Sequence, residues 1–147
     1  MRRPDDPRGT PGASSSGLGR VILVDTSSWI HLLRPDGDRT VHARVEEALR
    51  AGTACWCPLV QLELWNGARG GRERRALRGL AEALPELPID EEVWRTAYDL
   101  AQRARSQGVT VPATDVLIAA CAARHDAALE SADSDFDLLA SLDGPTS

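Results

Sequence analysis

The chain has 147 residues, 42% of them hydrophobic, which suits one globular domain built around a single core. It contains no lysine and therefore lacks the Gly-Lys-Ser/Thr phosphate loop of ATP- and GTP-hydrolysing enzymes, and no apolar run reaches the length of a membrane span. The net charge is −5. Residues 1–20 hold four Arg and two Asp, a net charge of +2, so residues 21–147 carry −7. Such an acidic domain argues against a protein that only binds nucleic acid.

The first 20 residues are rich in Pro, Gly and Ser, and no apolar stretch follows Arg2 and Arg3. This composition is typical of a disordered tail and not of a signal peptide. We therefore predict a disordered tail at 1–20, a folded domain at 21–142, a flexible end at 143–147 and a cytoplasmic location. An odd number of cysteines fits that compartment, and we expect all three to be core residues: Cys55, Cys57 and Cys121.

Short apolar runs alternate with amphipathic segments along the rest of the chain. In chain order they predict a strand at 20–24, helices at 26–33 and 39–50, a strand at 53–57, helices at 58–66 and 69–83, a strand at 84–89, helices at 90–107 and 112–124, a strand at 127–131 and a helix at 135–142. Gly52 and Gly108 end two of these helices. The alternation indicates an α/β domain with a central parallel sheet, in which functional sites form where strand C-termini meet the following helices.

Four carboxylates occupy positions that acidic residues normally avoid. Asp25 ends the apolar run at 21–24, and Glu63 lies within the apolar helix pattern LVQLELW. Asp115 opens the apolar run at 116–120, and Asp133 follows the last predicted strand. Acids beside buried apolar surface are costly unless something compensates them, and a divalent cation is a common compensation.

Each acid also has a purely structural explanation. Asp25 could cap the helix that follows it, and Asp115 could sit in a helix first turn where the dipole favours negative charge. Asp133 belongs to an acidic run with Asp135 and Asp137, and most such runs are solvated surface. Glu63 is the hardest to explain structurally, because it is expected on the core-facing side of its helix. The occurrence of all four acids together favours a functional site over four separate structural roles.

Carboxylates that converge at strand ends repel one another, and a divalent cation relieves the repulsion. Oxygen ligands alone select Mg²⁺ or Mn²⁺ over zinc, and such an ion can orient water and stabilise charge on a phosphate. The three histidines show no ligand spacing to one another. We therefore expect water activation without a histidine base, with an acid such as Glu63 or Asp133 accepting the proton.

Four segments resemble those of a known family: VILVDTSSWI, LVQLELWNG, VPATDVLIAACAARH and LESADSDFDLLA. In order and spacing they resemble the PIN-domain ribonucleases, and most closely the VapC-type toxins of bacterial toxin–antitoxin pairs, over roughly residues 20–142. The resemblance implies a three-layer α/β/α PIN-like domain. It also implies Mg²⁺- or Mn²⁺-dependent endoribonuclease activity, inhibition by a small VapB-like antitoxin, and a homodimer.

The resemblance implies a role for each acid as well. Asp25, Glu63, Asp115 and Asp133 match the four acids of the family's active site, with Asp25, Asp115 and Asp133 as metal ligands and Glu63 acting through a water or a second metal. Whether Asp135 joins the site is left open. Hydroxyl groups of Thr26 and Ser27 are expected to support these acids. Ser131 stands where the family usually has Thr.

Five arginines between residues 69 and 78 form the densest positive segment and could hold RNA phosphates: Arg69, Arg72, Arg74, Arg75 and Arg78. The structural alternative is a solvated helix face paired with Glu73 and Glu82. Trp65 could stack on a base, or belong to the core, to a dimer surface or to an antitoxin surface.

Two alternatives to a nuclease remain open from the sequence. One is a non-catalytic RNA- or protein-binding domain on the same fold, which the presence of all four acids disfavours. A weaker one is a magnesium phosphatase for small phosphates, which the missing lysine and the order of the acids disfavour. Our hypothesis is a magnesium-dependent toxin that cleaves structured cellular RNA by metal-assisted hydrolysis of the phosphodiester bond.

Overall fold

The central sheet consists of three parallel strands in the order β3-β2-β4. Strand β2 (Ile22–Val24) lies in the middle, between β3 (Ala54–Cys55) and β4 (Ala128–Glu130). The register pairs Val24 with Glu130, so β2 and β4 end at the same edge of the sheet. The residues that follow them therefore begin side by side, and the predicted parallel sheet is confirmed.

These strands belong to a computed structural model that describes residues 20–143 of the chain. The terminal segments predicted to be disordered or flexible lie outside the described residues, apart from Arg20 and Asp143. Within the described part, no helix combines the length and the apolar character needed to cross a bilayer.

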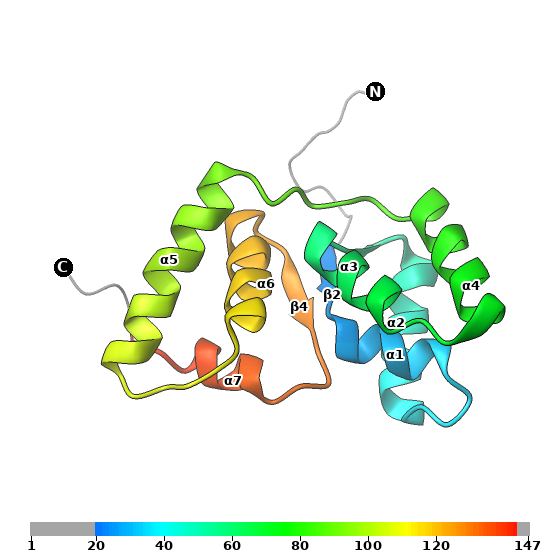
Figure 1. Ribbon diagram of the computed structural model, residues 1–147, viewed down its shortest axis with the longest axis horizontal. Coiled ribbons are helices and arrows are strands. Elements are labelled where there is room, and N and C mark those ends of the chain that lie inside the picture. The colour runs from blue at the N-terminus through cyan, green and yellow to red at the C-terminus, as the bar shows by residue number, and fades with distance from the viewer. Residues whose placement is uncertain (1–19, 144–147) are drawn as a thin grey trace.

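Helices flank the sheet, with α5, α6 and α7 beside β4 and the others gathered beyond β2 (Figure 1). They are α1 (Thr26–Leu33), α2 (Arg39–Ala51), α3 (Pro58–Asn66), α4 (Gly70–Ala83), α5 (Glu91–Ser106), α6 (Ala113–Arg124) and α7 (Asp135–Ala140). Asp25, Asp38 and Asp90 cap α1, α2 and α5 through their side chains. Gly52 ends α2 at φ 72°, a left-handed conformation that favours glycine.

Two tryptophans form the centre of the core. Trp29 of α1 and Trp56, which follows β3, are both inaccessible to solvent, and their ring centroids lie 6.1 Å apart in an edge-to-face arrangement. The three cysteines are free thiols buried in the same core, as predicted. This packing fixes α1, and with it the residues at its N-terminus, against the strands.

The predicted strand at 84–89 is wrong. Only a single bridge joins Glu86 to Trp56, and β3 itself covers two residues of the predicted 53–57. Pro85 and Pro88 have no backbone N–H groups and cannot donate to a ladder. The segment instead runs past Trp56 with two backbone hydrogen bonds, Trp56 N to the Pro85 carbonyl at 3.3 Å and Leu87 N to the Trp56 carbonyl at 2.8 Å.

Candidate active site

Asp25 lies at the junction between β2 and α1, where it is 4% exposed. Its Oδ2 accepts hydrogen bonds from the Ser27 hydroxyl at 2.8 Å, from the Ser131 hydroxyl at 3.0 Å and from the Ser27 N–H at 3.4 Å. None of the described residues donates to Oδ1. Three donors on one oxygen orient the carboxylate and leave the other oxygen available to a further partner.

The same hydroxyl groups fasten the loop after β4 to the start of α1. The Ser27 hydroxyl accepts from the Ala132 N–H at 3.1 Å, and the Ser131 hydroxyl accepts from the Asp133 N–H at 2.9 Å. Backbone pairing adds a bond from Asp25 N to the Glu130 carbonyl at 2.9 Å. Asp25 and the segment carrying Asp133 are therefore held together, by Ser27 in the supporting position expected for it and by Ser131, for which no such role was predicted.

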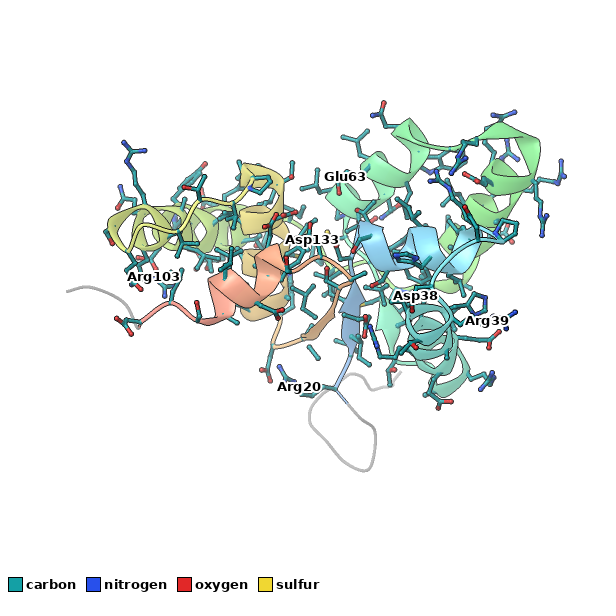
Figure 2. All side chains as sticks on the ribbon, turned by 90° about the horizontal axis from the view of Figure 1, so that it is seen from below. Arg20, Asp38, Arg39, Glu63, Arg103 and Asp133 are labelled. Atoms are coloured by element: carbon teal, nitrogen blue, oxygen red, sulfur yellow. The ribbon has the colours of Figure 1, made fainter. Side chains whose placement is uncertain are left out.

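Glu63 approaches the same region from α3. Its Oε1 accepts a hydrogen bond from the Thr26 hydroxyl at 2.6 Å, which ties α3 to the first residue of α1. Val60 and Leu64 form the buried face of α3, and Glu63 lies half-buried at its border, on the side towards the segment that carries Asp133 (Figure 2). The prediction that Glu63 shares the core-facing side is therefore only partly right.

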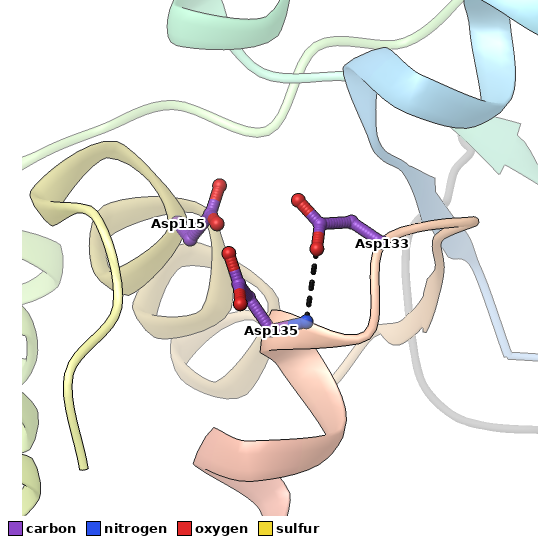
Figure 3. A group of neighbouring side chains, drawn as sticks. All are labelled: Asp115, Asp133 and Asp135. Atoms are coloured by element: carbon purple, nitrogen blue, oxygen red, sulfur yellow. Dashed lines mark hydrogen bonds between the residues drawn. The ribbon is translucent and has the colours of Figure 1, made fainter.

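Asp115, Asp133 and Asp135 form a cluster in which one oxygen of each lies within 4.8 Å of the others. Asp115 comes from the first turn of α6, Asp133 from the loop after β4, and Asp135 from the start of α7 (Figure 3). The Asp135 N–H donates to Asp133 Oδ1 at 2.9 Å. Asp135, whose membership the sequence left open, lies in this group, and Asp25, which was predicted as a metal ligand, is not part of it.

The acidic surroundings alter the protonation of Asp115. Burial, the largest cause, and the nearby carboxylates of Asp133, Asp135 and Asp25 together raise its pKa from 3.8 to about 7. Its Oδ2 is buried and has no hydrogen-bond partner among the described residues. Burying a carboxylate oxygen without a hydrogen-bond partner costs free energy, so Asp115 destabilises the folded state unless a proton or a cation binds to it.

The donor set fits a hard divalent cation. Three carboxylates supply oxygen atoms only, they converge from three segments, and one of their oxygens lacks any partner in the described part of the chain. Mg²⁺ and Mn²⁺ prefer oxygen ligands and relieve repulsion between carboxylates. Asp25 Oδ1 adds a further candidate ligand atom beside the cluster.

Sequence reasoning missed a supporting contact behind Asp25. Glu130, the last residue of β4, accepts from Arg44 of α2 at 2.9 and 3.2 Å and from the fully buried hydroxyl of Ser28 at 3.2 Å. This carboxylate joins α1, α2 and β4 beside the loop that carries the cluster. A charged residue at the end of an otherwise apolar strand was the only signal in the sequence.

Replacing Glu130 with Ala should lower the free energy of unfolding by about 1–3 kcal/mol, because the Ser28 hydroxyl would be buried without an acceptor. Urea unfolding measures the change. The matched control is Glu47→Ala, which removes an exposed pair with Arg50 and should change stability by less than about 0.5 kcal/mol. Equal effects of the two substitutions would contradict the bridging role of Glu130.

Comparison with known proteins agrees with this geometry. Residues 22–142 match the family model described as PIN domain. The chain is 34% identical over 125 residues to Ribonuclease VapC11 of Mycobacterium tuberculosis, which covers 83% of this chain and 93% of that protein.

Two solved structures share the fold. The VapBC-5 toxin–antitoxin structure from Mycobacterium tuberculosis has a TM-score of 0.63 at 23% identity, covering 84% of this chain and 93% of the matched one. Mycobacterium tuberculosis VapC20, described as a sarcin–ricin-loop-cleaving toxin, has a TM-score of 0.62 at 19% identity, covering 83% and 96%. The family match spans nearly all of the described residues, and the chain therefore belongs to the PIN-domain family, among the VapC ribonucleases.

Proposed function

We propose that the protein is a divalent-metal-dependent endoribonuclease and the toxin of a type II toxin–antitoxin pair, acting in the cytoplasm on structured cellular RNA. The observation that carries the proposal is the convergence of Asp115 and Asp133 beside Asp25, with an unpartnered buried oxygen on Asp115. The similarity to VapC11, which is named a ribonuclease, supports the same activity, and the sarcin–ricin-loop cleavage ascribed to VapC20 supports a folded RNA as the substrate.

In this proposal Asp115, Asp133 and Asp25 hold Mg²⁺ or Mn²⁺, and Asp135 is a further candidate ligand. When bound, the ion would orient water and neutralise charge on the phosphate. Glu63 would accept the proton of the attacking water: Thr26 occupies Oε1, and no described residue donates to Oε2. Attack of water on the phosphorus with release of the 3′ oxygen leaves a 5′-phosphate and a 3′-hydroxyl, the products that the family resemblance implies.

We propose two protein partners. One is a VapB-like antitoxin, which the toxin–antitoxin complex among the structural neighbours supports. The other is a second copy of the chain. Trp94 and Tyr98 on α5 are 43% and 62% exposed with ring centroids 6.2 Å apart, and large exposed aromatic pairs are typical of protein interfaces.

The test of the proposed activity is cleavage of an end-labelled structured RNA by the purified protein. We expect no cleavage in EDTA, and cleavage that returns on adding Mg²⁺ or Mn²⁺, with fragments whose new 5′ ends are phosphatase-sensitive. RNA that stays intact with either ion would favour the non-catalytic binding domain. Equal cleavage with and without EDTA would refute the metal requirement.

A further inference from the structure

A basic groove lies where the end of α1 meets the start of α2 and the side of α4. It has a volume of about 530 Å³, and three arginines and one histidine line it: Arg34, Arg39, Arg72 and His42. The rest of the lining is mostly apolar or backbone, with Glu46 as the one acidic residue. In Figure 2, α1 runs between the labelled residues Glu63 and Arg39. The groove therefore lies along α1, beyond the carboxylates.

Arg34 connects this groove to the candidate active site. It also lines a smaller cavity shared with Glu63, Gly67 and Glu73. A salt bridge to Glu73 at 3.5 Å and a hydrogen bond to the Gly67 carbonyl at 3.4 Å hold the Arg34 guanidinium in place. Arg34 therefore lies between the groove and the small cavity beside Glu63.

The charges in the groove are unequally compensated. Glu73 neutralises Arg34, and Arg50 pairs with Glu46 at 3.0 Å. Arg39 and Arg72 are exposed, and neither forms an ion pair with any residue between 20 and 143. Six other arginines of the described residues, Arg74 and Arg75 among them, also form no ion pair within this range. What distinguishes Arg39 and Arg72 is that both line the groove.

The structure also divides the arginine segment that the sequence singled out. Arg72 faces the groove, whereas Arg74 and Arg75 are exposed on α4 and do not line it. None of the three forms a salt bridge with Glu73, which pairs with Arg34 instead. Glu73 therefore does not neutralise the arginines of its own helix, as the structural alternative required. Position on the helix, and not charge alone, distinguishes Arg72.

We propose that the groove binds the RNA strand beyond the scissile phosphate, with Arg39 and Arg72 each contacting a phosphate. The inference rests on the proposed nuclease function. A guanidinium group matches the oxygens of a phosphate in a bidentate arrangement, and such contacts carry no sequence information. On α7, beyond the proposed metal ligands, the exposed Asp137 repels a polyanion, which leaves the α1–α2–α4 side as the favourable path.

The experiment compares two double variants that lose the same charge. Arg39→Gln with Arg72→Gln removes the proposed contacts, and Arg74→Gln with Arg75→Gln is the matched control. Steady-state cleavage is measured on a 15-nucleotide RNA and on a short RNA that ends near the scissile phosphate, and RNA binding is measured by anisotropy in EDTA. Thermal unfolding confirms that both variants fold.

For the groove variant we expect a roughly tenfold higher KM on the long RNA, an unchanged kcat and an unchanged KM on the short RNA. The slope of log affinity against log salt should become shallower by about 1.4, as two lost phosphate contacts on a single strand require. The control variant should keep its KM within about twofold, because its arginines lie outside the groove.

The failures of the two proposals can be told apart. If the wild type cleaves RNA and the two double variants behave alike, the groove assignment is wrong and the nuclease assignment stands. If RNA binds through Arg39 and Arg72 and stays intact with Mg²⁺ and Mn²⁺, the groove stands and the nuclease fails. If poly-glutamate, and not RNA, binds in a way that depends on these arginines, the groove serves an acidic protein segment and the RNA proposal is overturned.

Discussion

The Asp25→Asn protein is expected to cleave RNA at least about a thousandfold more slowly than the wild type and to cause no growth arrest when it is produced in bacteria. Asn caps helices as well as Asp does, and its carbonyl oxygen can still accept from Ser27 and Ser131, so α1 should stay in place. What the change removes is one negative charge beside the cluster. Cleavage rates on labelled RNA and colony counts after induction measure the two effects.

The control for that substitution is Asp36→Asn, which removes the same charge from an exposed position in the turn between α1 and α2. It should leave cleavage and toxicity unchanged within about twofold. Full toxicity of the Asp25→Asn protein, at an expression level equal to that of the wild type, would show that Asp25 is not part of the reacting centre.

Asp115→Asn should make the metal-free protein more stable, although it removes a proposed metal ligand. The free energy of unfolding should rise by about 1 kcal/mol, a shift of several degrees in Tm, because the amide no longer repels Asp133 and Asp135 and can donate to one of them. The same change should abolish the rise in Tm that saturating Mn²⁺ produces in the wild type. Scanning calorimetry with and without Mn²⁺ measures both effects.

The stability gain from Asp115→Asn should grow with pH. Since the pKa of Asp115 is raised from its ordinary value of 3.8 to about 7, the group favours the folded state fully below 3.8, where it is protonated in both states. That contribution is lost as pH rises towards 7. The difference in Tm between variant and wild type, both in EDTA, should therefore be smallest near pH 4 and level off above pH 7. A difference independent of pH would contradict the raised pKa of Asp115.

Local sequence patterns were sufficient to predict most of the fold. The β-branched run before Asp25 formed the central strand, Gly52 ended its helix at a positive φ, and Asp25 capped the helix that follows it. The segment at 84–89 failed because its apolar character resembled a strand, whereas Pro85 and Pro88 prevented regular pairing. Apolar pattern and hydrogen-bonding capacity conflicted there, and hydrogen bonding decided the outcome.

The sequence was sufficient to name the acidic residues of the candidate site, but it did not predict which of them lie in contact. Asp25 and Asp133 follow neighbouring strands, a relation that the parallel topology implies. Membership of Asp135 depends on how α7 begins, and the role of Glu130 depends on Arg44, which is 86 residues away in the chain. Likewise, only packing distinguishes Arg72 from Arg75, since the two have the same charge and lie on one helix. Such long-range relations leave no periodic signal in a single sequence.

A crystal of the protein soaked in Mn²⁺, with anomalous scattering used to locate the ion, would show directly whether the carboxylates of the candidate site hold a metal. We expect one strong anomalous peak at bonding distance from carboxylate oxygens of Asp115 and Asp133, with Asp25 or Asp135 completing the protein ligands. A well-folded crystal that binds Mn²⁺ only elsewhere on the surface, with the oxygen of Asp115 still unpartnered, would contradict this expectation.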